Sequence, residues 1–253
     1  MNIKVTYLYH SSFAVETPSR FLIFDYYQDT PRGAGLSEGV VDPAELAGKQ
    51  TVVFASHRHP DHYSSVVFDW REKIPDIRYV LSDDIPADGP AERMRPGETR
   101  SLDGLTVRTL QSTDEGVAFL VKADGFCVYH AGDLNWWKWD ENSDAENRRM
   151  ERDYKREVEK LKGEKINLAF LPVDPRQEED ALLGIGFFME TVGADHVVPM
   201  HAFGHPEFFD LLKTDPRAAS YRERVWFYRR RGEEVSYTPA RSTCSASSTG
   251  IGR

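Results

Sequence analysis

The segment "SHRHPDH", residues 56–62, places three histidines and an aspartate within seven residues. It follows the apolar run "TVVFA", which is typical of a buried strand. Because side chains two positions apart in an extended chain point to the same side, His57 and His59 converge. Asp61 and His62 then lie on the following turn, which we expect to open a helix, and face the same point. Imidazole and carboxylate groups arranged in this way suit zinc, with manganese and iron as alternatives.

Three explanations of this cluster are open from the residues alone: a metal site, a solvated histidine-rich turn, or a catalytic acid–base pair. The buried strand that precedes the cluster argues against a solvated turn. The two cysteines, Cys127 and Cys244, lie far from it, so no thiolate closes the site. A metal with free coordination positions lowers the pKa of bound water to about 7, which yields hydroxide at neutral pH. The pattern therefore favours a catalytic metal centre over a structural one.

The composition narrows the class of protein. The 253 residues carry a net charge of −9, with 40% hydrophobic and 29% charged residues, the balance of a soluble globular protein. So acidic a chain has no evident basic face for a phosphate backbone, and we do not expect nucleic acid as a partner. The opening residues lack the apolar segment of a signal peptide, and no run reaches transmembrane length. We therefore expect a cytoplasmic protein without a membrane partner; its oligomeric state is not specified by the sequence.

Strands on both sides of the cluster must hold it in place. β-Branched and aromatic residues alternate between turn residues in the first half of the chain. An apolar stripe on a charged background predicts a long helix over 144–163, which Gly163 ends. Shorter helices are expected after Asp42, at 179–193 and at 205–214. The expected strands are 2–10, 12–17, 20–27, 51–56, 77–82, 99–103, 105–112, 116–123, 126–133, 166–173 and 195–200.

Two blocks of the chain, 4–25 and 105–133, resemble each other. Both run strand, short loop, strand, turn, strand, and both end on aspartate. Such a repeat predicts two similar halves packed face to face, with two sheets inside and helices outside. We expect one domain over 1–240. The small polar tail 241–253 is expected to be disordered or to come from an expression vector.

Two later segments also end buried strands on metal-ligand residue types: "YHAGD" at 129–133 and "VVPMH" at 197–201. In this order after "SHRHPDH", they resemble the metallo-β-lactamase-fold hydrolases. The opening "YHSSFAVET" with "LIFD" resembles the branch that contains ascorbate-6-phosphate lactonase. The resemblance spans roughly residues 3–212. It implies an α/β fold, a four-layer αββα sandwich, and a metal-dependent hydrolase.

The resemblance also implies a set of ligands for two metals. Asp133 corresponds to the carboxylate that bridges the metals, although an aspartate after glycine is also common in ordinary turns. His201 corresponds to the last ligand of the second metal, the alternative being a histidine that merely ends a strand. Asp25 corresponds to an aspartate that orients an imidazole without touching metal. The implied ligands are His57 and His59 for the first metal, Asp61, His62 and His201 for the second, and Asp133 for both.

One stretch departs from the family pattern. The family places a third histidine of the first metal site on the loop after a strand, and residues 109–119 contain no histidine. Asp114 is one replacement ligand, because it offers a carboxylate. The alternative is a weakened or empty first site, in which a single metal works alone. The polar residues available in this stretch are Gln111, Ser112, Thr113 and Asp114.

Two residues are candidate catalytic groups. His10 follows the first strand, where the lactonase-like branch has its active site; the alternative is a turn or core histidine. Asp61 is the second candidate, because a carboxylate beside the metal can orient water or receive its proton. The remaining histidines are expected to be structural (His130), superficial (His196) or the start of a helix (His205).

The residues around the cluster bear on the substrate. Trp136, Trp137 and Trp139 follow Asp133 closely and predict either an apolar wall beside the metal or packing for the long helix. In "PVDPR", Asp174 or Arg176 faces the pocket or forms a surface ion pair. An arginine in the pocket would suit an anionic small molecule.

The sequence thus predicts hydrolysis of an ester, lactone, amide or phosphoester by metal-activated water, with zinc as the expected metal and one or two ions bound. A protein that has kept the fold as a metal-binding sensor is the alternative, favoured by the altered 111–114 stretch. A third possibility is oxygen or redox chemistry on a di-iron site.

Overall fold

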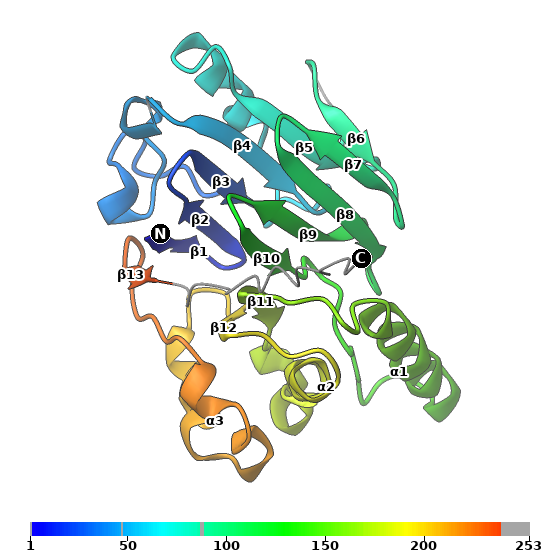
Figure 1. Ribbon diagram of the computed structural model, residues 1–253. Coiled ribbons are helices and arrows are strands. Elements are labelled where there is room, and N and C mark those ends of the chain that lie inside the picture. Colours follow the sequence, from blue (N-terminus) through cyan, green and yellow to red (C-terminus); the bar gives the residue numbers. More distant parts are fainter. Residues whose placement is uncertain (1, 47, 87–88, 239–253) are drawn as a thin grey trace, which may run out of the picture.

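Two mixed β-sheets face each other at the centre of the molecule (Figure 1). The computed structural model describes residues 2–46, 48–86 and 89–238. The expected tail 241–253, which includes Cys244, lies outside the described residues.

The first sheet carries the histidine cluster. Its seven strands are ordered β13-β1-β2-β3-β4-β5-β6. The neighbours β1, β2 and β3 are antiparallel, whereas β4, β5 and β6 continue the sheet in parallel. The strands are β1 (Ile3–Tyr9), β2 (Ser12–Glu16), β3 (Arg20–Phe24), β4 (Gln50–Ala55), β5 (Arg78–Ser82), β6 (Glu92–Met94) and β13 (Glu234–Tyr237).

The second sheet repeats this plan. Its six strands are ordered β12-β11-β10-β9-β8-β7. The neighbours β8, β9 and β10 are antiparallel, and β11 and β12 follow in parallel. The predicted repeat of 4–25 in 105–133 is therefore a repeat of topology. The strands are β7 (Thr99–Leu102), β8 (Leu105–Gln111), β9 (Val117–Ala123), β10 (Phe126–His130), β11 (Leu168–Pro172) and β12 (His196–Met200).

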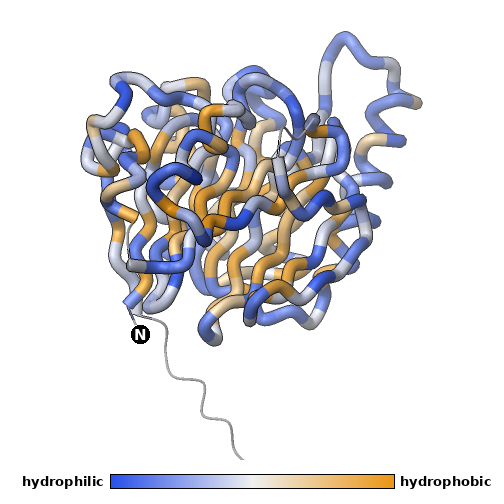
Figure 2. Tube along the Cα trace, turned by 90° about the horizontal axis from the view of Figure 1, so that it is seen from above, coloured by the Kyte–Doolittle hydropathy of each residue, from blue (hydrophilic) through white to orange (hydrophobic). Residues whose placement is uncertain are grey.

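Hydrophobic side chains of both sheets form one buried cluster between them, and the hydrophobic segments of Figure 2 run along these strands. On the outer side of the second sheet lie α1 (Asp144–Glu159), α2 (Leu183–Thr191) and α3 (Leu211–Thr214). The outer side of the first sheet is covered by 3-10 helices, η2 (Pro43–Leu46) and η3 (Ser65–Glu72), with Leu46 and Trp70 buried against it. The predicted αββα sandwich is confirmed, with 3-10 helices forming the helical layer over the first sheet.

The helices differ from the predictions at their ends. A capping box between Ser143 and Glu146 begins α1, and Tyr154 and Val158 of the predicted stripe are buried. The helix ends at Glu159, before the predicted 163, because the chain turns to bury Leu161. The predicted helix 179–193 is shorter, because η4 (Pro175–Asp180) precedes it and contains non-helical backbone. The region 205–214 forms η5 (Pro206–Asp210) and then α3.

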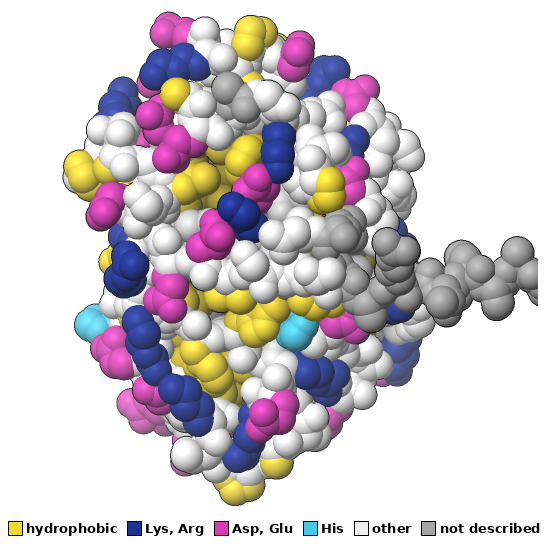
Figure 3. Space-filling model, turned by 60° about the vertical axis from the view of Figure 1, so that its left-hand side comes forward, with side chains coloured by type: hydrophobic (Ala, Val, Ile, Leu, Met, Phe, Trp, Pro, Cys, Tyr) yellow, Lys and Arg dark blue, Asp and Glu magenta, His cyan; other side chains and the backbone are white. Residues whose placement is uncertain are grey.

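On the face shown in Figure 3, basic and acidic side chains are interspersed, with hydrophobic side chains visible between them. Among the described residues, no helix has both the length and the apolar character that crossing a bilayer requires.

Candidate metal centre

The candidate site residues lie at the carboxyl ends of strands from both sheets. His10 follows β1, the "SHRHPDH" segment follows β4, Asp133 follows β10, and His201 follows β12. The carboxyl ends of parallel strands meet at one edge of a sheet, which is where open α/β sheets place their ligand sites. Two sheets with the same topology therefore bring these separated residues together.

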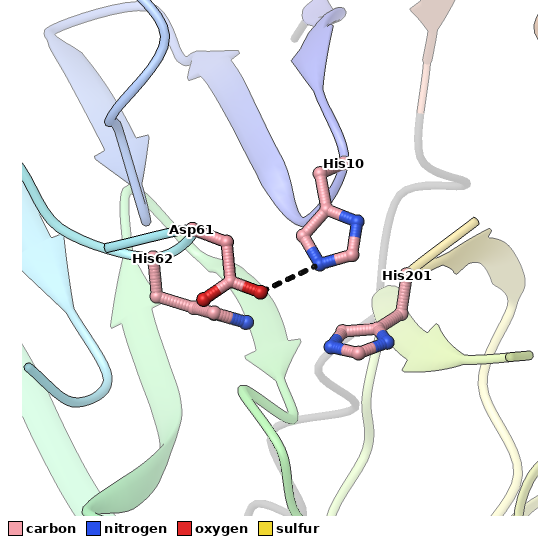
Figure 4. A group of neighbouring side chains, drawn as sticks. All are labelled: His10, Asp61, His62 and His201. Atoms are coloured by element: carbon pink, nitrogen blue, oxygen red, sulfur yellow. Dashed lines mark ion pairs between the residues drawn. The ribbon is translucent and has the colours of Figure 1, made fainter. Parts of the chain in front are cut away.

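The six residues implied as ligands come together, and His10 joins them. One group consists of His57, His59 and Asp133; a second consists of His10, Asp61, His62 and His201 (Figure 4). Within each group, potential ligand atoms lie within 4.8 Å of one another.

Asp133 lies between the two groups. Its Oδ2 is 3.6 Å from Nε2 of His57, and its Oδ1 is 3.2 Å from Nε2 of His62 and 3.3 Å from Nε2 of His201. This is the position that a bridging carboxylate requires.

The expected helix at Asp61 and His62 is absent, and this prediction is wrong. The backbone N–H groups of His62 and Tyr63 both donate to the carbonyl of His59, at 3.0 and 3.1 Å, which closes a tight turn. Ser64 then donates its N–H to Tyr26 and caps η3, which begins only at the next residue. The motif is therefore held by a turn, and its side chains converge without helical spacing.

A buried carboxylate orients two of the imidazoles. Oδ2 of Asp25 accepts hydrogen bonds from Nδ1 of His62 (2.8 Å) and from the hydroxyl of Ser56 (2.7 Å). Because the Ser56 proton goes to Asp25, the Ser56 oxygen accepts from Nδ1–H of His57 at 3.0 Å. His62 therefore keeps Nε2 free as a lone-pair donor, whereas Nε2 of His57 lies 3.0 Å from Nδ1 of His59. Asp25 does not belong to either group of ligands, in agreement with the role that the resemblance implied.

Asp174 does the same for His201. Its buried carboxylate accepts Nδ1–H of His201 at 2.9 Å and holds Arg176 through two nitrogens of the guanidinium. The sequence singled out Asp174 and Arg176 without separating a pocket role from an ion pair. In the structure they form an ion pair with each other, and Asp174 links that pair to the site.

Strained backbone gathers at this edge of the sheets. His10, Asp25, His201 and Phe203 have positive φ angles of 54°, 46°, 74° and 49°. Left-handed backbone is unfavourable for residues other than glycine and persists where surrounding contacts enforce it. Gly132, at φ 51°, passes so close to Ser56 that an added Cβ would lie 2.6 Å from the Ser56 Cβ. Glycine is therefore required immediately before Asp133.

Several buried polar atoms at the centre have no hydrogen-bond partner among the described residues. They include Nε2 of His62, Nε2 of His201 and Oδ1 of Asp133, which face one another. Buried polar groups are nearly always paired, and unpaired ones signal a missing ion or water. Two imidazole lone pairs and a carboxylate form the donor set of a zinc, iron or manganese site. The residues present therefore fit a divalent metal.

Without a metal, protons take its place. Although burial lowers it, the charge of Asp133 and a hydrogen bond to Asp174 raise the pKa of His201 to about 9. The pKa of His62 is also raised, because Asp133 and Asp25 outweigh its burial. By contrast, burial and the nearby charges of His201 and His62 lower the pKa of His10 to about 2. The positive charge of the centre is therefore carried by His62 and His201, the two imidazoles that are hydrogen-bonded to carboxylates.

The 109–119 stretch places two carboxylates close to the first group. Oδ2 of Asp114 lies 3.9 Å from Nδ1 of His59, and burial and the neighbouring Asp133 raise the pKa of Asp114. Glu115, which sequence reasoning missed, brings Oε2 to 3.6 Å from Nε2 of His59. Gln111 turns elsewhere and donates to the Ser112 carbonyl.

The three tryptophans divide between the two predicted roles. Trp137 is buried, donates Nε1–H to the Asp133 carbonyl (2.9 Å) and lies 5.5 Å from the His201 ring. Trp139 stacks on Trp137. Trp136 instead contacts Lys155 of α1. The apolar wall and the helix contact are thus both present, on different residues.

The other histidines lie outside both groups. His130 donates Nε2–H to the Ser11 carbonyl at 2.8 Å and stacks on Phe24, as a structural residue does. His196 is partly exposed and lies against Trp226. His205 stands at the start of η5, as predicted.

A known family matches the part of the chain that carries most of these residues. The profile described as "Beta-lactamase superfamily domain" matches residues 4–148. A UPF0173 metal-dependent hydrolase from Thermococcus kodakarensis is 27% identical over 147 residues, which are 52% of this chain and 61% of that protein. A second UPF0173 metal-dependent hydrolase, from Pelotomaculum thermopropionicum, is 26% identical over 52% of this chain and 62% of that protein. The chain thus spans about three fifths of the length of these relatives.

Solved structures share the fold over nearly the whole chain. Igni18, a metallo hydrolase from Ignicoccus hospitalis, superimposes with a TM-score of 0.66 at 21% identity, covering 95% of this chain and 100% of that one. The metallo-β-lactamase fold protein YhfI from Bacillus subtilis gives a TM-score of 0.59 at 13% identity, covering 93% of this chain and 99% of that one. At these identities the likeness concerns the fold alone.

Proposed function

Because this chain belongs to the beta-lactamase superfamily and has the metallo-β-lactamase fold, we propose that it is a metal-dependent hydrolase of a small molecule. The observation that carries this proposal is the convergence of unpaired Nε2 atoms on Asp133 from two different sheets. A structural site would have closed its coordination with protein ligands. Here Asp61 is partly exposed, which leaves the second group open on one side.

His57, His59 and Asp133, with Asp114 nearby, would hold a first metal, and Asp61, His62, Asp133 and His201 a second. A bound divalent metal supplies a nucleophilic hydroxide at neutral pH and polarises the bond under attack. Zinc is the metal we propose, since imidazole and carboxylate ligands without thiolate suit it.

Other residues of the chain have separate roles in the proposed reaction. Asp61, at the exposed side of its group, orients the attacking water and receives its proton. Asp25 and Asp174 keep the Nε2 lone pairs of His62 and His201 aimed at the centre. Trp137, buried beside His201, excludes bulk water from that side.

For the substrate, we propose an ester or lactone that carries one anionic group. Arg176 supports this choice. Its guanidinium lies 4.7 Å from the Phe203 ring and 5.6 Å from the Trp139 ring, and its side chain is 56% exposed. Arg176 also pairs with Asp174, whose carboxylate accepts Nδ1–H of His201. Arg176 also lines a neighbouring cavity of about 460 Å³, together with Lys138 and Trp139.

The test measures metal content and turnover together. The purified protein is loaded with zinc, its metal is counted by mass spectrometry, and it is screened with p-nitrophenyl acetate, chromogenic lactones and bis(p-nitrophenyl) phosphate. We expect bound zinc and hydrolysis that His62→Ala abolishes. The matched control is His196→Ala, which changes a histidine outside both groups.

Two other results would point to a function other than hydrolysis. A protein that binds metal without hydrolysing any of these compounds would be a sensor that has kept the fold. Bound iron with a visible absorption band would indicate the di-iron redox alternative.

A further inference from the structure

His10 belongs to the second group but is held differently from the other imidazoles in it. It follows β1 with φ 54°, and its side chain is fully buried. Its backbone N–H donates to the Tyr7 hydroxyl at 2.9 Å. Its ring packs against those of His201 and Phe203, with centroids 4.2 and 4.3 Å away. The ring is therefore fixed in position and orientation.

The partner of each Nδ1 atom determines which nitrogen carries the proton. The backbone N–H of Phe203 donates to Nδ1 of His10 at 3.2 Å, so this nitrogen has a lone pair and no proton. The single proton of the neutral ring is then on Nε2, and an imidazolium would set one N–H against another. His62 and His201 are the reverse: their Nδ1 atoms face carboxylates at 2.8 and 2.9 Å, which leaves the lone pair on Nε2.

A metal ligand must present a lone pair, and the nitrogen that His10 presents to the centre carries hydrogen. We propose that His10 is not a metal ligand but a neutral N–H donor for the substrate oxygen on which negative charge develops during attack. This inference deepens the proposed hydrolase and rests on it.

The surroundings of Nε2 support this role. The atom is buried and has no hydrogen-bond partner among the residues that the structure describes. Oδ2 of Asp61 is 3.6 Å away, beyond hydrogen-bond distance. The dashed line in Figure 4 joins these two side chains as an ion pair. The N–H therefore points into the space beside Asp61, where the proposed nucleophilic water and the substrate would meet. A donor fixed in advance, in a site shielded from water, stabilises a developing oxyanion without reorganisation.

Two variants of His10 distinguish a hydrogen-bond donor from a metal ligand. In His10→Asn, the shorter side chain keeps an acceptor for the Phe203 N–H and tolerates positive φ, but has no group that reaches the centre. In His10→Gln, the amide extends an N–H to about the position of Nε2. We expect both variants to bind as much zinc as the wild type. His10→Asn should lower kcat for p-nitrophenyl acetate by about 100- to 1,000-fold with little change in KM. His10→Gln should restore part of the lost kcat. The ligand control His201→Asn should lose zinc.

The position of the proton can be read without turnover. Long-range ¹H–¹⁵N correlation spectra of the zinc-loaded, histidine-labelled protein should show a protonated Nε2 and an unprotonated Nδ1 for His10. A protonated Nδ1, or a loss of zinc in His10→Asn, would overturn the inference even if the protein proves to be a hydrolase. If the wild type binds no zinc and hydrolyses nothing, the proposed function fails, and the donor role fails with it whatever the tautomer.

Discussion

Oδ2 of Asp25 lies 2.8 Å from Nδ1 of His62, and both side chains are completely excluded from solvent. The same carboxylate accepts a hydrogen bond from the Ser56 hydroxyl, and the Ser56 oxygen is hydrogen-bonded to Nδ1 of His57. One buried aspartate therefore sets the orientation of imidazoles in both groups. Asp174 repeats the relationship with His201 in the second sheet.

Replacing this carboxylate should weaken metal binding without removing a ligand. In Asp25→Asn, the amide keeps the size of the side chain but can turn its NH₂ toward Nδ1 of His62. We expect zinc affinity to fall about 10- to 100-fold, measured by competition with a chromogenic chelator. The control is Asp124→Asn, which breaks hydrogen bonds to Thr17 and Ser19 away from the site and should leave zinc affinity unchanged. Equal affinity in the two variants would contradict the assigned role.

The carboxylate of Asp114 should account for part of the first metal site. We expect Asp114→Ala to reduce zinc at the group of His57 and His59 while the second group stays filled. Titration by isothermal calorimetry would show the weaker binding step lost and the tighter step kept. Gln111→Ala, which changes a side chain directed away from the site, serves as the control. Two unchanged steps in Asp114→Ala would mean that the first metal does not use this residue.

The metal-free protein should become less stable as pH rises. His201 has a pKa raised from 6.5 to about 9 in the folded state. A group with a raised folded pKa stabilises the fold fully below its unfolded pKa and loses that effect as pH rises through the folded one. The Tm of chelator-treated protein should therefore decline between pH 6.5 and about 9. Zinc protection should grow over the same range, since metal competes with protons for the imidazoles.

Thermal melts at a series of pH values, with chelator and with zinc, would check this. His201→Asn should remove most of the decline in the metal-free protein. A chelator-treated Tm that stays level or rises in this window would show that the imidazole is not held in its charged form.

Gly132→Ala should be costly because two effects combine. The added Cβ would lie 2.6 Å from the Ser56 Cβ, and the backbone has a φ of 51°. We expect a loss of about 2–4 kcal/mol in the free energy of unfolding, from overpacking and strain together. Gly125→Ala is the matched control: its φ is 73°, but its Cβ would meet nothing within 4 Å, so only strain of about 1 kcal/mol remains. Urea unfolding of both variants would separate the crowding from the strain.

Arg176 should select for an anionic substrate. We expect Arg176→Met to raise KM for an ester that carries a carboxylate by about tenfold or more, and to leave KM for a neutral ester nearly unchanged. Because Arg176 also pairs with Asp174, the zinc content of the variant must be measured alongside. An equal change in KM for both esters would remove the argument for an anionic group.

Sequence patterns predicted eleven of the strands because each strand is a local run of β-branched and aromatic residues. The short edge strands β6 and β13 were not predicted, since pairing at the sheet edge, rather than local pattern, forms them. The expected helix at Asp61 was wrong because the His59 carbonyl closes a turn there. Glu115 was missed because a lone glutamate in a polar loop carries no signal of its own.

The sequence by itself predicted most strands, because each is a local run of residues, and its resemblance to a known family implied the fold and the candidate ligands at the ends of those strands. Only the tertiary structure decided which nitrogen of each imidazole faces the centre. That choice depends on partners from other strand ends, such as Phe203, 193 residues from His10. Hydrogen bonds between distant segments leave no pattern in a single sequence, yet they separate a metal ligand from a proton-bearing donor.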